Sequence, residues 1–227
     1  MKFTPRDVKL VRDIALSHVL SRDQILGLGY FGSVTRANTR LRILRELGMV
    51  KRLETPFFAQ HLYAVGPWAG PLLGDQIGRL VSGRRESPRF LQHALSVTNA
   101  RLYLASKGAS NWFFEAQART TFRHNERGCE ARPDGLAVLP SGLTAVEVDL
   151  GHVAPAKFKE KLLGYDAFIA SGECARLWKE PCFKLLVLTT GRLRAEHLCG
   201  LLPSPCRFDF RAVTFADLGI ASVGAWS

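Results

Sequence analysis

Two runs of alternating hydrophobic and polar residues lie near the middle of the chain. Residues 134–139 and 144–150 each alternate with the period of two that is typical of a β-strand, and residues 140–142 between them favour a tight reversal. In the second run this period places Glu147 and Asp149 on the same face. The pattern therefore predicts a β-hairpin that carries two acidic side chains side by side.

Hydrophobic residues at helical spacing predict helices on both sides of this hairpin. In the N-terminal third, Thr4-Pro5, Ser21 and Ser33 are typical starts of three short helices. Residues 49–66 then predict a second hairpin. Further along, the patterns predict helices at residues 88–107, from residue 155 onward and at residues 193–202, and strands at residues 112–118, 181–190 and 211–215.

These elements predict an α/β protein with two domains. Three helices and a hairpin in residues 1–66 resemble the winged helix-turn-helix, a DNA-binding fold. Residues 67–88 are rich in glycine and proline and are expected to form a linker. Residues 89–219 follow the order helix, three strands, helix, strand, helix, strand, which matches a restriction-endonuclease-like mixed sheet flanked by helices, and residues 220–227 form a tail.

The net charge of +11 indicates more than solubility, because it exceeds what solubility requires. In a 227-residue chain with 47% hydrophobic residues, it predicts a folded protein with a polyanionic partner, either double-stranded DNA or an anionic membrane. DNA is favoured, since no hydrophobic run approaches the roughly 18 residues of a membrane-spanning helix. The first residues lack the hydrophobic core of a signal peptide, so we expect a cytoplasmic protein. We also expect it to act as a homodimer or within a nucleoprotein complex.

The third predicted helix carries basic residues opposite its hydrophobic stripe. In a winged helix-turn-helix this element enters a DNA groove and contacts phosphates and base edges. A basic face that is simply solvated is the alternative, but its position on the third helix favours DNA binding. The expected DNA contacts are Arg36, Thr39, Arg40 and Arg42 on the helix, and Lys51 and Arg52 on the hairpin that follows.

Acidic residues of the central hairpin are candidates for a metal site. Carboxylates buried beside hydrophobic residues are expensive to ionise unless a cation neutralises them. Asp134, at the start of the neighbouring strand, would join Glu147 and Asp149, and Mg²⁺ or Mn²⁺ is the expected ion. Glu115, on the strand expected at residues 112–118, is a further candidate ligand. The alternatives are a turn-forming aspartate in Pro-Asp-Gly and a solvated strand face that carries the other two acids.

The pair Pro133-Asp134, followed on the next strand by Glu147, resembles the PD-(D/E)xK nuclease superfamily. The resemblance implies that the Asp and the Glu hold Mg²⁺ and that a lysine, usually two residues after the Glu, acts on the attacking water. Asp149 stands at that lysine position here and is counted among the catalytic candidates, which departs from the superfamily pattern. Some members carry the lysine on the following helix instead.

The helix expected from residue 155 offers three lysines for this role. Helical spacing places Lys161 and Tyr165 on one face together with Lys157, whereas Lys159 lies on another face. We expect Lys161 to be catalytic and Tyr165 to be a packing residue. More narrowly, the run Glu-Val-Asp-Leu-Gly followed by Lys-x-x-x-Tyr resembles the replication-relaxation family and the related MobC-type plasmid mobilisation proteins.

Three classes of function follow from these patterns. The first is a metal-dependent nuclease that nicks or cleaves DNA at a specific site in plasmid or mobile-element transfer or replication. The second is a DNA-binding regulator of transcription or replication whose nuclease-like domain is inactive, which the missing lysine at position 149 favours. The third is a structural adaptor of a nucleoprotein complex, which the sequence does not distinguish from the second.

Two further expectations concern the second domain. Residues 119–132 are polar and are expected to form a loop whose arginines approach a phosphate backbone. The five cysteines contain no Cys-x-x-Cys pair, which argues against a zinc site and predicts reduced, mostly buried thiols.

Overall fold

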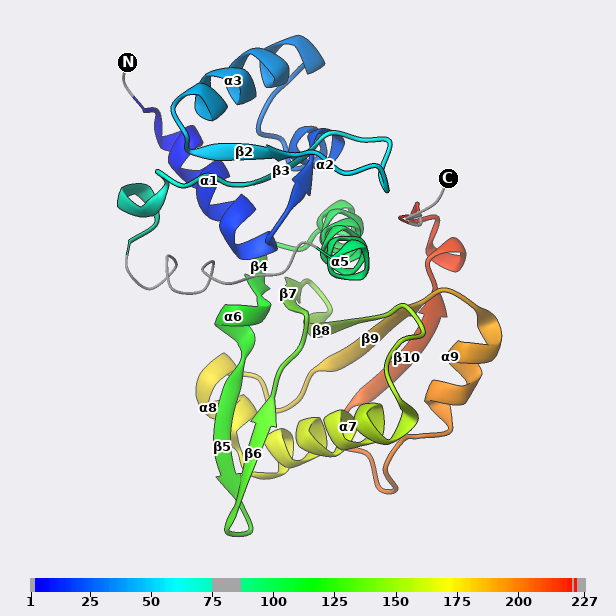
Figure 1. Cartoon of the computed structure of the whole chain (residues 1–227). Coiled ribbons are helices and arrows are strands. Elements are labelled where there is room, and N and C mark those ends of the chain that lie inside the picture. The colour runs from blue at the N-terminus through cyan, green and yellow to red at the C-terminus, as the bar shows by residue number, and fades with distance from the viewer. Residues whose placement is uncertain (1–2, 75–86, 222, 224–227) are drawn as a thin grey trace. The chain divides into compact units, whose positions relative to one another are not determined.

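The computed structural model describes residues 3–74, 87–221 and 223 (Figure 1). The chain divides into two compact units, residues 1–102 with residues 223–227, and residues 103–222. Helices and sheets occur in the described parts of both units, so the predicted mixed α/β class is confirmed. Most of the expected linker and most of the expected tail lie outside the described residues.

The N-terminal unit contains the three predicted helices and the predicted hairpin. Its elements are α1 (Pro5–Ser17), β1 (Leu20–Ser21), α2 (Arg22–Gly27), α3 (Val34–Glu46), β2 (Val50–Leu53) and β3 (Leu62–Val65). The hydroxyl oxygens of Thr4, Ser21 and Ser33 each accept a hydrogen bond from a backbone N–H of the first helical turn, which is why the helices begin there. The strands form an antiparallel sheet in the order β1-β3-β2, against which the buried faces of the helices pack.

Helix α5 (Pro88–Ser106) begins after Ser87, whose hydroxyl oxygen accepts a hydrogen bond from the first turn. We expected this helix to begin the second domain, but its residues up to Leu102 belong to the N-terminal unit. There Gln24 Nε2 of α2 donates to the Leu95 carbonyl oxygen at 2.8 Å. Ala69, in the segment expected to be a linker, is fully buried in the core of the same unit. The boundary between the units therefore falls within α5, not in the glycine- and proline-rich segment.

The C-terminal unit is built on a mixed five-stranded sheet. The strands of this sheet are β4 (Asn111–Phe114), β7 (Gly135–Leu139), β8 (Gly142–Asp149), β9 (Lys184–Thr189) and β10 (Asp209–Thr214). The remaining elements are α6 (Glu115–Ala118), β5 (Thr120–His124), β6 (Arg127–Ala131), α7 (Pro155–Ala170), α8 (Glu173–Trp178), α9 (Arg192–Cys199) and the short helix η1 (Ala216–Leu218). The sheet order is β10-β9-β8-β7-β4. In it β8, β9 and β10 are parallel, and β7 is antiparallel to both of its neighbours.

The predicted central hairpin is formed by β7 and β8. Gly135 pairs with Val146 of β8 and also with Phe114 of β4, so it lies inside the sheet. A Cβ atom at this position would lie 2.1 Å from the Trp112 ring, and glycine is required for that reason. The Pro-Asp-Gly sequence therefore starts a strand, and the alternative of a turn-forming Asp134 is wrong.

Two segments of the C-terminal unit differ from the predicted elements. The strand predicted at residues 112–118 ends at Phe114, and the remaining residues form α6. The loop predicted at residues 119–132 is instead the antiparallel hairpin β5–β6. Its two-residue turn, Asn125-Glu126, has positive φ angles of 48° and 62°, which suit the twist of a tight hairpin. The hairpin was not predicted because Asn-Glu is a weaker turn signal than Asn-Gly and because its polar strands show no clear alternation of hydrophobic and polar residues.

The β5–β6 hairpin packs on α7 through one of its faces. The Phe122 and Phe168 rings are in contact, with centroids 5.4 Å apart. At Gly164 of α7 a Cβ atom would lie 2.6 Å from the Glu130 carbonyl oxygen, so only glycine permits this close approach of helix and strand. The tip of the hairpin extends beyond the helix (Figure 1).

The cysteines and the hydrophobicity of the helices bear on two further expectations. All five cysteines are free thiols. Only Cys174 is buried, so the prediction of mostly buried thiols is wrong. Among the described residues, no helix combines the length and the hydrophobicity that crossing a membrane requires.

Candidate functional site

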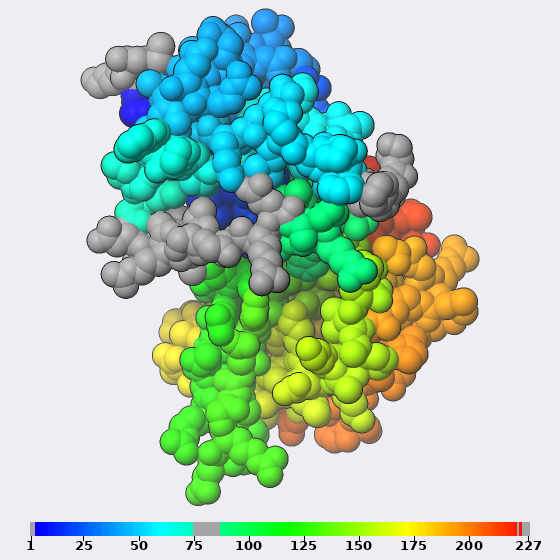
Figure 2. All heavy atoms as spheres, viewed as in Figure 1, coloured from blue at the N-terminus to red at the C-terminus, as the bar shows by residue number. Residues whose placement is uncertain are grey.

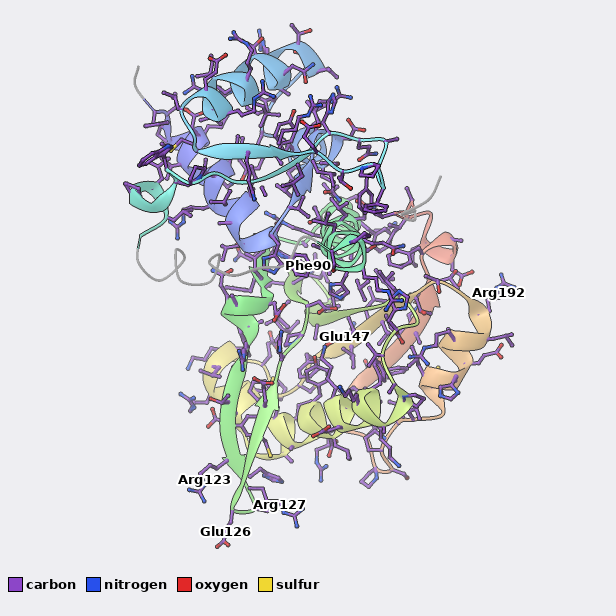
Figure 3. The ribbon with its side chains drawn as sticks, viewed as in Figure 1. Phe90, Arg123, Glu126, Arg127, Glu147 and Arg192 are labelled. Atoms are coloured by element: carbon purple, nitrogen blue, oxygen red, sulfur yellow. The ribbon has the colours of Figure 1, made fainter. Side chains whose placement is uncertain are left out.

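Glu147, on β8 (Figure 3), is only 3% exposed, and two side chains of α7 hold its carboxylate. Lys161 Nζ donates to one carboxylate oxygen of Glu147, and the Tyr165 hydroxyl donates to the other. Lys161 and Tyr165 are four residues apart, so both project from one face of α7, as predicted. Tyr165 packs in the core as expected, but it also fixes the orientation of the carboxylate.

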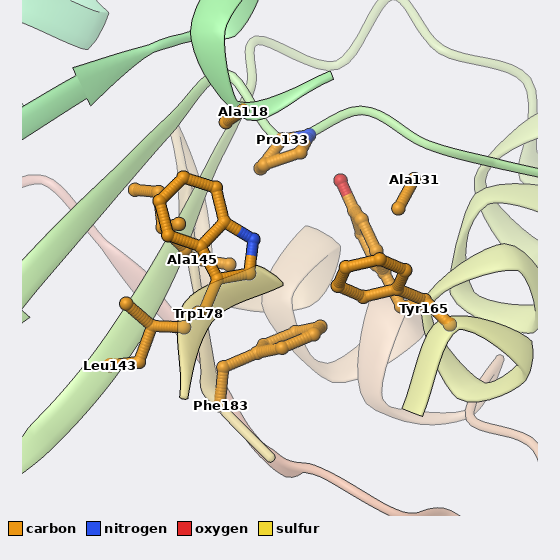
Figure 4. Close-up of a pocket in the computed structure, with 10 residues that line it drawn as sticks. Ala118, Ala131, Pro133, Leu143, Ala145, Tyr165, Trp178 and Phe183 are labelled. Carbon is orange, nitrogen blue, oxygen red and sulfur yellow. The ribbon is translucent and has the colours of Figure 1, made fainter. Parts of the chain in front are cut away.

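The Tyr165 ring lines a small apolar cavity of about 10 Å³ (Figure 4). Pro133 and Ala131 lie beside its hydroxyl group, and Trp178 and Phe183 lie on the other side of the cavity. A cavity of this size and polarity does not hold bulk water. Glu147 therefore has a weakly polar surrounding on the side of the tyrosine.

The protonation of this cluster is set by burial and by its neighbours. Burial and the Asp134 carboxylate raise the pKa of Glu147 to about 7, although Lys161 and Tyr165 oppose the rise. Burial disfavours the Lys161 ammonium, but the Glu147 and Asp134 carboxylates outweigh this and raise the pKa of Lys161. Burial and Glu147 raise the pKa of Tyr165 well above its usual value, so the phenol stays protonated. Near neutral pH, Glu147 can thus gain or lose a proton beside a permanent cation.

Asp134 precedes β7 and lies beside the same part of β8. Its Oδ2 atom accepts a hydrogen bond from Val148 N at 2.8 Å, and its own backbone N–H donates to the Val146 carbonyl oxygen at 3.0 Å. The two bonds hold the Asp134 carboxyl against β8, where its charge acts on Glu147. Asp134, Glu147 and Lys161 are therefore brought together as the sequence predicted.

Asp149 is buried like Glu147 but has a different partner. Its side chain is 1% exposed and forms an ion pair with Arg194 of α9, in which Arg194 Nε donates to Asp149 Oδ2 at 2.8 Å and Nη2 lies 2.7 Å from the same oxygen. Gly151 N donates to its other carboxylate oxygen at 2.8 Å. The expected convergence of three acids does not occur, and no group of three or more His, Cys, Asp or Glu side chains suited to a metal is present in the described residues. The arginine that holds Asp149 is 45 residues away along the chain, so local patterns gave no sign of it.

Glu115 also has a partner of its own. It lies on α6 instead of a strand and forms an ion pair with Arg132, with 2.5 Å between Arg132 Nη2 and Glu115 Oε1. Its charge contributes to the raised pKa of Lys161, so it lies near the cluster without a contact to Glu147. The structure therefore does not place Glu115 as a direct member of the predicted site.

An open groove with a volume of about 1220 Å³ leads to this cluster. One wall is the β5–β6 hairpin and the other is α7, and Asp134 and Lys161 lie in its lining. Lys157 also lines the groove, as its predicted position on the face of Lys161 requires, whereas Lys159 is exposed and is not part of the lining. Of the three candidate lysines, only Lys161 contacts the buried carboxylate.

In the N-terminal unit, Arg40 differs from the other predicted DNA contacts. Its guanidinium forms a two-bond ion pair with Asp7 of α1, at 2.8 Å and 2.5 Å, and the Asp7 carboxyl is completely buried. Burial alone would raise the pKa of Asp7, but hydrogen bonds from Arg40 and Thr4 lower it to about 2. Arg40 therefore joins α3 to α1, and we correct its expected role as a DNA contact.

The remaining predicted contacts are better placed to meet a partner. Arg36 and Thr39 are exposed on α3, and Arg42 is exposed with a single ion pair to Glu46 at 2.7 Å. Lys51 is exposed on β2, and Arg52 beside it pairs with Glu54 at 3.0 Å between Nε and Oε1. Exposed ion pairs of this kind contribute little energy and exchange readily for other anions.

The fold and the site define a mixed α/β protein with a buried Glu–Lys–Tyr cluster beside an open groove. Residues 11–178 match the family model described as replication-relaxation, and the chain belongs to this family. No curated protein matches the chain. Among solved structures, the crystal structure of protein VC1899 from Vibrio cholerae matches with a TM-score of 0.34 and 10% identity, covering 96% of this chain and 55% of that chain. The chain thus spans about half the length of that protein.

Proposed function

We propose that the chain is a DNA-binding protein whose C-terminal unit is a PD-(D/E)xK-type nuclease domain that cuts DNA at a specific site. One observation carries the proposal: Asp134 and Lys161 line the groove, Lys161 binds the buried Glu147 carboxylate, and the charge of Asp134 acts on both. They are the residue types of that motif, with the lysine moved to the helix. Membership of the replication-relaxation family and the resemblance to MobC-type proteins support a role in replication or mobilisation of plasmids and other mobile DNA.

Two carboxylates at this place suit a divalent cation. Mg²⁺ and Mn²⁺ are commonly bound by one or two protein carboxylates, with water and phosphate oxygens in the other positions. Asp134 and Glu147 would hold the ion, which would supply Lewis-acid stabilisation and a more acidic water. Tyr165 keeps the Glu147 carboxylate in a fixed orientation, and the Lys161 ammonium is positioned to stabilise negative charge on the phosphate. Asp149 and Glu115, each held by an arginine, are left out of the proposed ligand set.

In the N-terminal unit we propose a winged helix-turn-helix that selects the DNA site. Three helices and an antiparallel hairpin in this order support it, with α3 as the element that enters the DNA groove. The proposed contacts are Arg36, Thr39 and Arg42 on α3 and Lys51 and Arg52 on the hairpin.

The proposed nuclease is tested on a supercoiled plasmid that carries the replication or transfer origin of the protein's own replicon. With Mg²⁺ or Mn²⁺, the protein should convert it to open-circular or linear DNA. Asp134→Asn and Glu147→Gln, which keep the side-chain shapes, should each abolish cutting, and Lys161→Ala should slow it by roughly 10²- to 10⁴-fold. Lys159→Ala, an exposed lysine of the same helix, is the matched control and should leave the rate unchanged. Cutting that survives both carboxylate changes would contradict the assignment.

A DNA-binding regulator with an inactive nuclease-like domain is the second candidate. It is favoured by Asp149, which stands where the motif usually has its lysine and is fixed by Arg194. Under this proposal the plasmid stays intact with both metals, while the protein still binds origin DNA. The regulator would then use the Glu147–Lys161 pair to hold β8 to α7.

A further inference from the structure

The β5–β6 hairpin concentrates positive charge at its tip. Arg123 and Arg127 flank the turn (Figure 3), and within the described residues neither has a carboxylate at ion-pair distance. Arg123 Nη2 donates only to the backbone carbonyl oxygen of Glu126, at 3.2 Å. By contrast, Arg119 and Arg132 at the base of the hairpin are both paired with glutamates. The two tip arginines therefore remain available for an anionic partner, with Glu126 as the one acid of the turn.

The position of the hairpin brings this charge next to the groove. The strands project beyond α7, and the tip residues are exposed (Figures 1 and 2). Arg127 and His124 of the tip line the same groove as Asp134 and Lys161. A partner that contacts the tip and enters the groove therefore reaches the proposed site.

The size and charge of the groove favour a polymer over a small molecule. Its volume of about 1220 Å³ exceeds the roughly 300–1,000 Å³ that is usual for pockets of small ligands. Its charge is mixed: Lys157 and Lys161 of α7 stand with the hairpin arginines, against Glu130, Glu160 and Asp134. Glu130, Arg132 and Lys161 are each held in an ion pair, so among the described residues the lining cations without a carboxylate partner are Lys157 and Arg127. Lys157 and Arg127 are thus placed to contact phosphates along the groove.

We propose that the β5–β6 hairpin is a DNA-contacting ribbon, which enters a groove of duplex DNA and holds one phosphodiester strand along the open protein groove that the hairpin and α7 line. The major groove of B-DNA admits a two-stranded β-ribbon, and arginine is well suited to phosphates and base edges. Arg123 and Arg127 make the contacts at the tip, and Lys157 contacts the backbone from α7. The inference rests on the proposed nuclease function for its orientation toward the site, but it assigns a second DNA contact that is separate from α3.

The first test compares two charge-matched variants of the full chain. Binding to a short duplex is measured by fluorescence anisotropy in EDTA over a range of salt concentrations. In Arg123→Ala/Arg127→Ala, the slope of log affinity against log salt should fall by about 2, because each lost phosphate contact removes roughly 0.9 from the slope. The control Arg192→Ala/Arg211→Ala removes two exposed arginines from α9 and β10 in the same unit and should keep the slope. Equal changes in both variants would overturn the ribbon, since they would reflect net charge alone.

The second test asks directly which molecule the tip touches. A photo-crosslinking amino acid replaces Glu126 at the turn, and in a control protein it replaces Glu196, an exposed residue of α9. The tip should crosslink to duplex DNA and the control should not. Crosslinking to single-stranded DNA alone, or no crosslinking to DNA, would overturn the proposal.

The ribbon and the proposed function can fail separately. A plasmid that stays uncut while the tip still crosslinks to duplex DNA removes the nuclease and keeps the ribbon. A plasmid that is cut in an Asp134-dependent way, with no tip crosslink and no change in salt slope, removes the ribbon and keeps the nuclease. Loss of site-specific binding in Arg36→Ala/Arg42→Ala reports on α3 alone.

Discussion

Replacing Lys161 by methionine removes the cation from the buried Glu147 carboxylate and keeps most of the side-chain length. Glu147 is 3% exposed, so its charged form would lack compensation and its pKa would rise further above about 7. Breaking a buried ion pair typically costs about 3–5 kcal/mol. The Lys161 side chain is 31% exposed, which lets water reach one side of the pair, so we expect the lower end, about 3 kcal/mol.

This loss should depend on pH in a defined direction. Since folding raises the pKa of Glu147 from 4.5, its contribution to stability is fully present below that value and is lost as the pH rises toward the folded pKa. In the natural protein, stability stops falling with pH near pH 7, where Glu147 is deprotonated in the folded state. In Lys161→Met, stability keeps falling at higher pH, by up to about 1.4 kcal/mol per pH unit. The two proteins should therefore differ little at pH 5 and by about 3 kcal/mol at pH 9.

Urea unfolding at pH 5, 7 and 9 measures this difference, with fluorescence of Trp112 and Trp178 as the signal from the C-terminal unit. Glu147→Gln/Lys161→Met carries no charge at either position of this pair and should recover most of the stability at pH 9. Lys159→Met, on an exposed part of α7, controls for the loss of a lysine. A penalty for Lys161→Met that is equal at pH 5 and pH 9, or one that the double variant does not relieve, would refute the argument.

Two more predictions concern the Arg40–Asp7 ion pair and the proposed binding of metal by Glu147. Arg40→Ala leaves the Asp7 carboxylate buried and should lower the free energy of unfolding by about 3 kcal/mol near neutral pH, whereas exposed Arg36→Ala should change it by less than about 0.5 kcal/mol. Urea unfolding checks this, and equal effects would contradict the structural role of Arg40. The affinity for Mn²⁺, measured by calorimetry, should rise up to about tenfold per pH unit below pH 7 and then level off, because Glu147 must lose its proton. A profile without this rise, or one kept by Glu147→Gln, would exclude Glu147 as a ligand.

The fold was predictable where local chemistry decides it. Ser21 and Ser33 begin helices because their hydroxyl groups satisfy backbone donors, and that requirement is visible in the sequence. The central hairpin was also predictable, since alternation and turn residues agree. The β5–β6 hairpin was missed, because its strands are short and polar and its Asn125-Glu126 turn lacks glycine.

The candidate site was predictable in part for the same reason. Helical spacing alone places Lys161 and Tyr165 on one face of their helix. Strand alternation places Glu147 on the sheet face that this helix covers, so the sequence was sufficient to predict that the three side chains lie together. The partners of Asp149 and Arg40 could not be predicted, because each lies on an element distant in sequence. Sequence patterns show which face a side chain occupies, but the choice of partner for a charge depends on how separate elements pack.

The close contact between the β5–β6 hairpin and α7 depends on the absence of a side chain at Gly164. At this contact α7 lies so close to the Glu130 carbonyl oxygen of the ribbon that no side-chain carbon fits between them. The closeness of the two groove walls at this contact therefore depends on a residue that carries no side-chain functional group. Alanine at this position would push the two walls apart and enlarge the groove without altering any of its charges.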